Sequence, residues 1–289
     1  MHSLLIVSLV IFTDLDGTLL DGAYSFLPAL PALEALRRAS VPCVICSSKT
    51  RREIEYYRES LRNGEPFICE NGGAVFVPDG YFGFPLAGGG RPALKGAGAT
   101  AVREGCYEVL RLGETYRELR LALTAFRASG YRVTGFGDLT AEEIAARTGL
   151  PINQAVMAKE REFDEPFYLE TDDRAEIEIA EAARQRGLRV SGRGLRHLTG
   201  NSDKGRAATI LAGLFKEILC RVTFAAIGDG PTDLPMLGAV DRPIIVQRPG
   251  GAYDPDLAGE GFVEAGGVGP EGWKRAVMML LEEDAGRQE

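Results

Sequence analysis

The amino-acid sequence predicts an α/β fold, a doubly wound parallel sheet with an inserted α+β domain, from two observations. First, short apolar runs recur and end in polar or glycine-rich turns: LIVSLVIFTDLDGT, VPCVICSSKT, PFICENGGAVFV, RVTFAAIGDG and, more weakly, RPIIVQR. Their apolar character is continuous, as in parallel strands that helices cover on both faces. Second, the helical patterns LPALPALEALRRAS and TRREIEYYRESLRNG separate the first three runs. This βαβ alternation is typical of a doubly wound sheet.

The alternation is interrupted in the middle of the chain. It stops after about Val77 and returns with the helical pattern DKGRAATILAGLFKEI. The intervening segment holds a Gly-, Ala- and Pro-rich stretch, the strand pattern YEVLRLG, three helical patterns (ETYRELRLALTAFRASG, LTAEEIAARTG and DDRAEIEIAEAARQRG) and the short strands LRVSG and LRHLTG. We therefore expect residues 1–84 and 200–289 to form the core and residues 85–199 to form the inserted α+β domain.

Composition excludes several classes of partner. With 41 Asp and Glu against 33 Lys and Arg, the net charge of -8 argues against a nucleic-acid partner. The opening MHSLLIVSLVIF lacks the basic start and cleavage site of a signal peptide, and no apolar run reaches the ~20 residues of a membrane helix. Cys43 and Cys46 alternate on a predicted strand, which favours packing over metal or redox chemistry. We expect a cytoplasmic protein with no membrane partner; the oligomeric state is left open.

Four carboxylates follow two of the predicted strands. Asp14 and Asp16 end the first apolar run, and Asp229 and Asp233 end the fourth. The carboxyl ends of parallel strands meet at one edge of a sheet, so these side chains are expected to lie close together. Carboxylates gathered in this way repel one another unless a cation lies among them. Oxygen-only donors suit Mg²⁺, which is the cofactor that the sequence predicts.

Further polar side chains share this edge. They follow the second strand, follow the third strand, or open the late helix, whose first turn favours an anion. These residues are Ser47, Ser48, Lys49, Glu70, Asn71 and Lys204.

The order and spacing of DLDGT, the serine after the second strand, DKG and GDGPTD resemble those of the haloacid-dehalogenase-like phosphatase superfamily. The resemblance implies a Rossmann-like core in which Asp14 is the nucleophile, forming an aspartyl-phosphate, and Asp16 is the general acid and base. Ser47 and Lys204 would then contact the phosphoryl group. Mg²⁺ would bind Asp14, the backbone carbonyl of Asp16 and Asp229, with Asp233 contributing directly or through water.

Each of these roles has a simpler alternative. Ser47 can merely end a strand, since serine favours turns. Lys204 can be a solvated helix residue. Asp233 can be a favourable charge at a helix N-terminus that does not touch the metal.

Within the superfamily, the chain resembles the mannosyl-3-phosphoglycerate phosphatase family, which carries a type-II cap between the second and third motifs. The segments that carry the resemblance are FTDLDGTLLD, SSKTR, PFICENGGAVFVP, GFGDLTAEEIAARTGL, AKEREFDEPF, NSDKGRA, DLPML and GPEGWKRAV. One departure stands in the fourth motif, where Thr232 replaces an amide that commonly orients the loop. The glycine-rich stretch 79–105 is also longer than the family pattern.

The implied substrate carries a phosphate, a carboxylate and a sugar, so local cations must offset the negative protein. The candidates are Lys49, Arg51, Arg161, Arg193, Arg196 and His197. We hypothesise that Arg161 binds the glycerate carboxylate or orders its loop, because a guanidinium matches a carboxylate. Sugar hydroxyls would be bound by Glu162, Asp164 or Glu165. Ser48, Lys49, Glu70, Asn71 and His197 are further substrate-binding candidates.

The alternatives for these substrate-binding residues are structural. The segment REFDEPF can be a solvated loop with an internal ion pair. Glu70 and Asn71 can be turn formers. His197 can be a packed histidine with its hydrogen bonds satisfied.

Three functions remain at this stage. The first is an Mg²⁺-dependent phosphatase that converts mannosyl-3-phosphoglycerate to mannosylglycerate. The second is a glucosyl-3-phosphoglycerate or other sugar-phosphate phosphatase on the same scaffold, since one hydroxyl configuration separates the two sugars. The third is a non-catalytic phosphate-binding module, against which the intact Asp14, Asp16, Lys204 and Asp229 argue.

Overall fold

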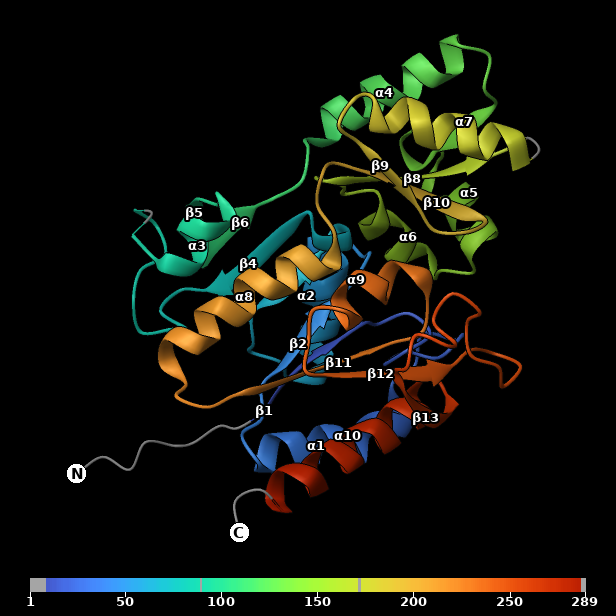
Figure 1. Ribbon diagram of the computed structural model, residues 1–289. Helices are drawn as coiled ribbons and strands as arrows, with labels where there is room; N and C mark the ends of the chain where they lie inside the picture. Colours follow the sequence, from blue (N-terminus) through green and yellow to red (C-terminus); the bar gives the residue numbers. More distant parts are fainter. Residues whose placement is uncertain (1–8, 89, 171–172, 287–289) are drawn as a thin grey trace.

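The computed structural model describes residues 9–88, 90–170 and 173–286. Its main sheet has nine strands in the order β13-β12-β11-β1-β2-β3-β4-β6-β5 (Figure 1). The six strands from β13 to β3 pair in parallel, whereas β4, β6 and β5 add antiparallel pairs. The strands are β1 (Leu9–Thr13), β2 (Cys43–Cys46), β3 (Phe67–Cys69), β4 (Ala74–Pro78), β5 (Ala101–Glu104), β6 (Tyr107–Arg111), β11 (Thr223–Gly228), β12 (Arg242–Gln247) and β13 (Val263–Val268). The first predicted run begins before β1, and its residues 5–8 lie outside the described residues.

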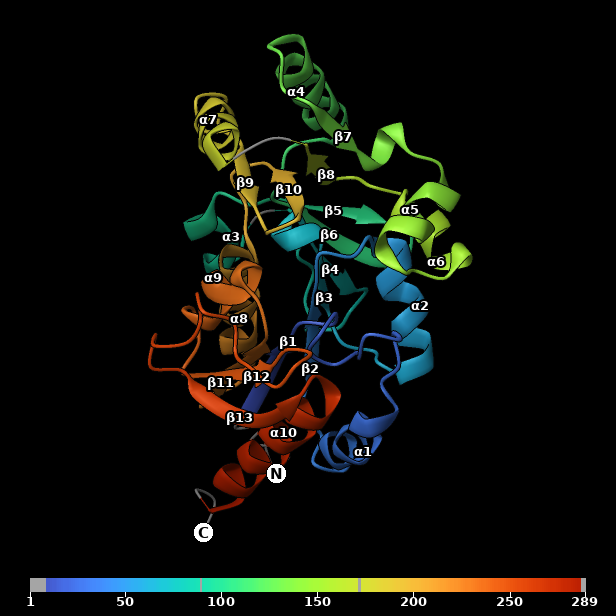
Figure 2. The same cartoon turned by 90° about the vertical axis from the view of Figure 1, so that its right-hand side faces the viewer.

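Helices cover both faces of the main sheet, as the continuous apolar strands predict. Along β1, Leu9 and Ile11 pack into one buried cluster with α1, α2 and α10, and Val10 and Phe12 pack into another with α3, α8 and α9. Figure 2 shows α8 and α9 on one side of the sheet and α1 and α2 on the other. These helices are α1 (Leu30–Arg38), α2 (Arg51–Leu61), α3 (Pro92–Ala97), α8 (Lys204–Ile218), α9 (Leu234–Leu237) and α10 (Pro270–Gly286). The predicted α/β class is confirmed.

A second, four-stranded antiparallel sheet lies beyond one edge of the main sheet (Figure 1). Its order is β7-β8-β10-β9, and α4 and α7 pack on one face while α5 and α6 pack on the other. We call this sheet and its four helices the inserted module. Its elements are α4 (Tyr116–Ala128), β7 (Val133–Gly135), α5 (Ala141–Thr148), α6 (Ile152–Ala158), β8 (Asp164–Leu169), α7 (Asp173–Arg184), β9 (Arg189–Ser191) and β10 (Leu195–Thr199).

The inserted module begins later in the chain than the expected residue 85. The hairpin β5–β6 belongs to the main sheet, because β6 pairs with β4 over five residues from Ala74–Arg111 to Pro78–Tyr107. The sequence pattern misplaced this hairpin because antiparallel strands need no crossover helix, so the βαβ alternation ends before the sheet does. The chain enters the inserted module after Arg111 and leaves it after Thr199.

Two local expectations can be compared directly with the structure. The helical pattern LTAEEIAARTG forms α5, which begins with a capping box: the Thr140 hydroxyl accepts the Glu143 amide and the Glu143 carboxylate accepts the Thr140 amide. The segment REFDEPF, for which a solvated loop is one expectation, contributes instead to a strand: Asp164–Leu169 forms β8, and the first four residues of β8 are buried. In the described part of the chain, no helix is both long and apolar enough to cross a membrane.

Candidate active site

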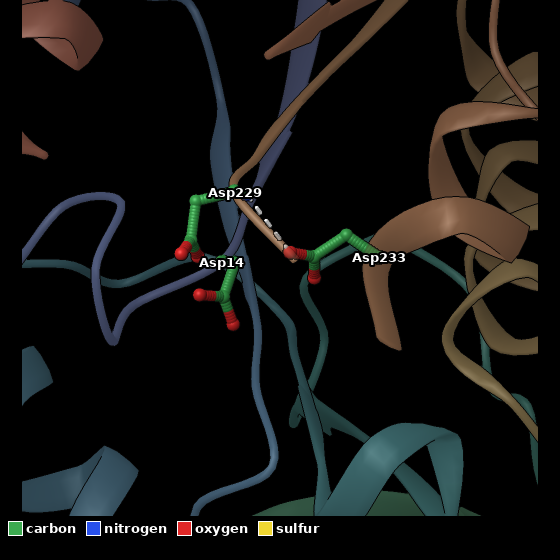
Figure 3. A group of neighbouring side chains, drawn as sticks. All are labelled: Asp14, Asp229 and Asp233. Atoms are coloured by element: carbon green, nitrogen blue, oxygen red, sulfur yellow. Dashed lines mark hydrogen bonds between the residues drawn. The ribbon is translucent and has the colours of Figure 1, made fainter. Parts of the chain in front are cut away.

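The central position of β1 in the main sheet sets the geometry of the site. Parallel pairing with β11 on one side and β2 on the other places Asp14 between Asp229 and Ser47. One carboxylate oxygen from each of Asp14, Asp229 and Asp233 lies within 4.8 Å of the other two. Figure 3 shows the three side chains gathered at this point. Three of the four strand-end carboxylates that the sequence predicts to meet are therefore adjacent, whereas Asp16 is outside this group and pairs with Lys49.

Lys204 joins two of these carboxylates. Its Nζ lies 2.6 Å from Asp14 Oδ1 and 2.6 Å from Asp233 Oδ1, and its side chain is only 1% exposed. Burial alone would lower the pKa of Lys204, but the charges of Asp14 and Asp233 outweigh it and raise that pKa. Lys204 is thus a buried cation of the site, and the alternative of a solvated helix residue is wrong.

Asp233 has a second role in the loop after β11. Its Oδ2 accepts the backbone amides of Asp229 at 3.0 Å and Gly230 at 3.1 Å, while its Oδ1 accepts Lys204. These bonds fix the loop whose orientation Thr232 left in question. Asp233 thus accepts three protein donors, so fewer of its lone pairs are free for a metal ion than those of Asp229, whose Oδ1 accepts the Thr18 hydroxyl.

Two motif glycines are required by close approach to the site. Gly17 has a φ of +79°, and a Cβ there would lie 2.7 Å from Asp229 Oδ2. A Cβ at Gly205 would overlap the Pro235 carbonyl, so the glycine lets α8 bring Lys204 close to the loop after β11. Any larger residue at the glycine of DLDGT or of DKG would therefore clash with the loop after β11 or with the start of α9.

The electrostatics of the cluster fit a divalent cation. Burial raises the pKa of Asp14 well above its ordinary value, and repulsion from Asp233, Asp229 and Asp16 adds to this against the opposing charge of Lys204. Burial and the Asp233 charge likewise raise the pKa of Asp229 to about 7. A bound cation relieves this repulsion, and an all-oxygen donor set of this kind suits Mg²⁺. Asp14 and Asp229 fit as its carboxylate ligands.

Lys49 pairs with Asp16, the second carboxylate of the DLDGT motif. Its Nζ lies 3.0 Å from Asp16 Oδ1 and 3.4 Å from Glu53 Oε1, and its side chain is 4% exposed. The two carboxylates raise the pKa of Lys49 although burial opposes the charge. Ser47, also buried, accepts the Lys49 backbone amide through its Oγ at 3.2 Å. Lys49 therefore balances Asp16 in this state.

A cavity of about 610 Å³ opens beside Asp16, between the main sheet and the inserted module. Of the predicted residues, it is lined by Asp16, Ser48, Lys49, Arg161 and His197. Residues that the sequence analysis did not select also line it, including Tyr24, Phe136, Arg147, Tyr168 and Arg248. No motif marks these side chains, because they come from distant elements that only the fold brings together.

Arg161 ties the inserted module to the main sheet. Its Nη1 donates to the Ser48 carbonyl at 2.7 Å and its Nε donates to the Ala158 carbonyl at 2.8 Å. The carboxylates of Glu53 and Asp164 each lie 3.8 Å from its guanidinium, and the side chain is 5% exposed. The alternative of a solvated loop is wrong, since this residue is buried and orders the contact between the two parts.

Glu70 and Asn71 make a second link and do not line the cavity. The Glu70 carboxylate accepts the backbone amides of Glu162, Phe163 and Asp164 at 2.8–3.1 Å. Asn71 Nδ2 donates to Asp164 Oδ2 at 2.9 Å. Both Glu70 and Asn71 have positive φ angles, +49° and +54°. In place of the expected substrate contacts, Glu70 and Asn71 make a buried connection to the β8 segment.

The acidic residues of REFDEPF bind protein groups as well. Asp164 Oδ2 lies 2.7 Å from His197 Nδ1, which orients the imidazole at the cavity wall. Glu165 accepts Arg120 Nη1 at 2.6 Å and the Gly137 amide at 3.1 Å. Glu162, Asp164 and Glu165 are absent from the cavity lining, so the hypothesis of sugar contacts by these three side chains is not supported.

Three of the predicted cations lie away from the cavity, each paired with an acid. Arg51 pairs with Glu55, Arg193 with Asp256 and Arg196 with Glu176. Their positive charge is therefore already balanced outside the site.

This arrangement of carboxylates and lysine at the carboxyl edge of a parallel sheet, with an inserted module above it, defines a haloacid-dehalogenase-like hydrolase. A family model for haloacid dehalogenase-like hydrolases matches residues 11–81. A phosphatase of this superfamily from Bacteroides thetaiotaomicron has the same fold, with a TM-score of 0.63 at 16% identity over 98% of this chain and 97% of that one. The sucrose-phosphatase of Synechocystis gives a TM-score of 0.60 at 13% identity over 94% and 97% of the two chains.

The chain belongs to the mannosyl-3-phosphoglycerate phosphatase family, as the resemblance drawn from its motifs predicts. It is 41% identical to the glucosyl-3-phosphoglycerate/mannosyl-3-phosphoglycerate phosphatase of Methanococcoides burtonii, over 94% of this chain and 97% of that protein. The protein of the same name from Persephonella marina is 38% identical over 95% and 98%. The mannosyl-3-phosphoglycerate phosphatase of Pyrococcus furiosus is 39% identical over 82% and 90%.

Proposed function

We propose that the chain hydrolyses the phosphate monoester of mannosyl-3-phosphoglycerate, releasing mannosylglycerate and phosphate through a phosphorylated Asp14. The observation that carries this proposal is the pairing of Asp14 Oδ1 with Lys204 Nζ at 2.6 Å beside Asp229; Asp14 is two residues before Asp16, which lines the cavity. A carboxylate held in this way can act as a nucleophile, and the lysine offsets the charge of an incoming phosphate.

The first step forms the bond between an Asp14 carboxylate oxygen and phosphorus while the bond from phosphorus to the glycerate oxygen breaks. Asp16 donates a proton to that leaving oxygen. Lys204 and the Ser47 hydroxyl stabilise the phosphoryl oxygens as charge develops on them. Mannosylglycerate then leaves, and Asp14 carries the phosphoryl group.

The second step returns the enzyme to its starting state. Water attacks phosphorus and gives a proton to Asp16, and the bond from Asp14 to phosphorus breaks to release phosphate. Mg²⁺ bound at Asp14, the Asp16 carbonyl and Asp229 would screen the nucleophile from the anionic substrate. Asp233 keeps Lys204 and the loop after β11 in place throughout.

We also assign substrate selection to the inserted module as a cap domain. Its side chains Phe136, Arg147, Tyr168 and His197 form the wall of the cavity that faces the main sheet. A second candidate function is hydrolysis of glucosyl-3-phosphoglycerate, because two relatives that match nearly all of this chain are named for both substrates.

The test is phosphate release, with Mg²⁺, from mannosyl-3-phosphoglycerate, glucosyl-3-phosphoglycerate and a panel of other sugar phosphates. We expect the highest kcat/KM on the first, and loss of turnover in Asp14→Asn with an unchanged circular dichroism spectrum. A wild-type protein that releases no phosphate from any member would favour the non-catalytic module. Retained multiple turnover in Asp14→Asn would exclude that residue as the nucleophile.

A further inference from the structure

The basic side chains that line the cavity differ in whether they already have hydrogen-bond or ion-pair partners within the protein. Lys49 pairs with Asp16 and Glu53, and Arg161 donates to two backbone carbonyls and lies near two carboxylates. Arg248 donates to Asp254 Oδ2 at 2.7 Å. These three cations therefore have partners within the protein and are poor choices for a second anionic group of a ligand.

Arg147 is the exception among the arginines and lysines that line this cavity. It lies in the last turn of α5, is exposed, and has no carboxylate partner within residues 9–88, 90–170 and 173–286. Its guanidinium carbon lies 5.1 Å from the ring centroid of Tyr168, which lines the same wall. Stacking on an aromatic ring holds a guanidinium in place while leaving its N–H edge free to donate.

The position of Arg147 suits a ligand group other than the reacting phosphate. Under the proposed function the phosphate binds beside Asp16, which lines the cavity with Ser48 and Lys49 of the main-sheet part, whereas Arg147 and Tyr168 line it from the inserted module. A planar guanidinium with free N–H groups binds both oxygens of a carboxylate. A cation with no acid beside it also attracts an anion without first breaking an ion pair.

We propose that Arg147 is a specificity-determining residue that binds the carboxylate of the substrate, held in position by the Tyr168 ring. This inference rests on the proposed function, because it assumes a substrate with a carboxylate in addition to its phosphate. It assigns to Arg147 the role that the sequence had offered to Arg161, whose contacts are structural.

The experiment compares Arg147→Ala and Arg147→Lys with the wild type on mannosyl-3-phosphoglycerate and on p-nitrophenyl phosphate, which has no carboxylate. We expect Arg147→Ala to raise KM for the first about 10- to 100-fold, the worth of a charged hydrogen-bonded pair, with little change on the second. Arg147→Lys should recover part of the loss, since lysine keeps the positive charge but cannot bind both carboxylate oxygens as a planar guanidinium does. Equal losses on both substrates, or none on either, would overturn the proposal.

A matched control is Arg186→Ala. Arg186 is also in the inserted module and its guanidinium carbon lies 5.4 Å from the Phe126 ring centroid, but it does not line this cavity. It should leave both KM values unchanged. A KM effect of Arg186→Ala equal to that of Arg147→Ala would show a general charge effect and would reject the assignment.

A second measurement separates this inference from the proposed function. 3-Phosphoglycerate and glycerol 3-phosphate, which differ by one carboxylate, are used as inhibitors of p-nitrophenyl phosphate hydrolysis. The wild type should bind the carboxylate-bearing compound more tightly, and Arg147→Ala should remove that preference. If mannosyl-3-phosphoglycerate is not hydrolysed but this preference is present and depends on Arg147, only the proposed function fails. If the wild type shows no preference, the role of Arg147 fails.

Discussion

The carboxylate of Glu70 accepts the backbone amide of Phe163 at 2.8 Å, and this bond joins the end of β3 to the start of the β8 segment. The same carboxylate accepts the amides of Glu162 and Asp164, so one buried side chain satisfies three backbone donors from the inserted module. Glu70 thus adds to the non-covalent contacts of Arg161 and Asn71, which supplement the two covalent connections near Arg111 and Thr199.

Replacing Glu70 by Ala should destabilise the protein strongly. The change leaves buried amide donors of residues 162–164 without their acceptor, so we expect a loss of about 3 kcal/mol or more in the free energy of unfolding. Urea denaturation measures it. The control Glu34→Ala removes an exposed carboxylate that pairs with Arg38 and should cost less than about 0.5 kcal/mol. Similar midpoints for the two variants would contradict the role given to Glu70.

The stability of the protein should fall with rising pH through a contribution from Glu70. Burial raises the pKa of Glu70 to about 8, against the opposing effects of Arg161 and the amides. Between the ordinary glutamate pKa and about 8, the folded protein retains a proton that the unfolded chain has released. Unfolding then releases a proton, so higher pH favours the unfolded state.

This contribution can be isolated with Glu70→Gln. The wild-type free energy of unfolding, measured from pH 5 to pH 8, should decrease more steeply than that of the variant, which has no proton to lose at this position. Parallel pH profiles for the two proteins would show that Glu70 does not titrate in this range.

Gly205→Ala should damage both stability and activity. The new methyl group would overlap the Pro235 carbonyl, so α8 must shift and move Lys204 away from Asp14. We expect a loss of about 1–3 kcal/mol in stability, with a fall in kcat. The control is Gly96→Ala in α3, where the added Cβ meets no heavy atom within 4 Å. That change should be neutral or stabilise by up to about 1 kcal/mol. A kcat unchanged in Gly205→Ala would rule out this account of the DKG glycine.

Mg²⁺ should stabilise the folded protein as well as support turnover. A cation among Asp14, Asp229 and Asp233 relieves the repulsion that raises the pKa of Asp14 and Asp229. After dialysis against a chelator, we expect added Mg²⁺ at a hundredfold excess over its Kd to raise Tm by about 5 °C or more. In Asp229→Asn this rise should be much smaller. An unchanged Tm in the wild type would count against a metal at this cluster.

The sequence predicted the carboxylate cluster because each member follows a strand or opens a helix, and parallel strands bring their carboxyl ends to one edge. It did not predict the burial of REFDEPF. Asp164 is paired with Asn71, 93 residues away, and Glu165 with Arg120, 45 residues away. A run of charges whose partners are this distant looks solvated until the fold is known. Arg147 was missed for a related reason, since only the tertiary structure shows that it lines a cavity and that no acid among the described residues pairs with it.

The central place of β1 has a consequence for synthesis of the chain. Its two neighbours are β2, made soon afterwards, and β11, whose residues 223–228 come more than two hundred residues later. During synthesis on the ribosome, one edge of β1 therefore stays unpaired until β11 has emerged. Asp14 likewise has no Lys204 to pair with until most of the chain has been made. Such distant pairing slows folding and leaves an apolar edge exposed to other chains. A nascent chain that stops before β11 would contain Asp14, Ser47 and Lys204 but neither Asp229 nor Asp233.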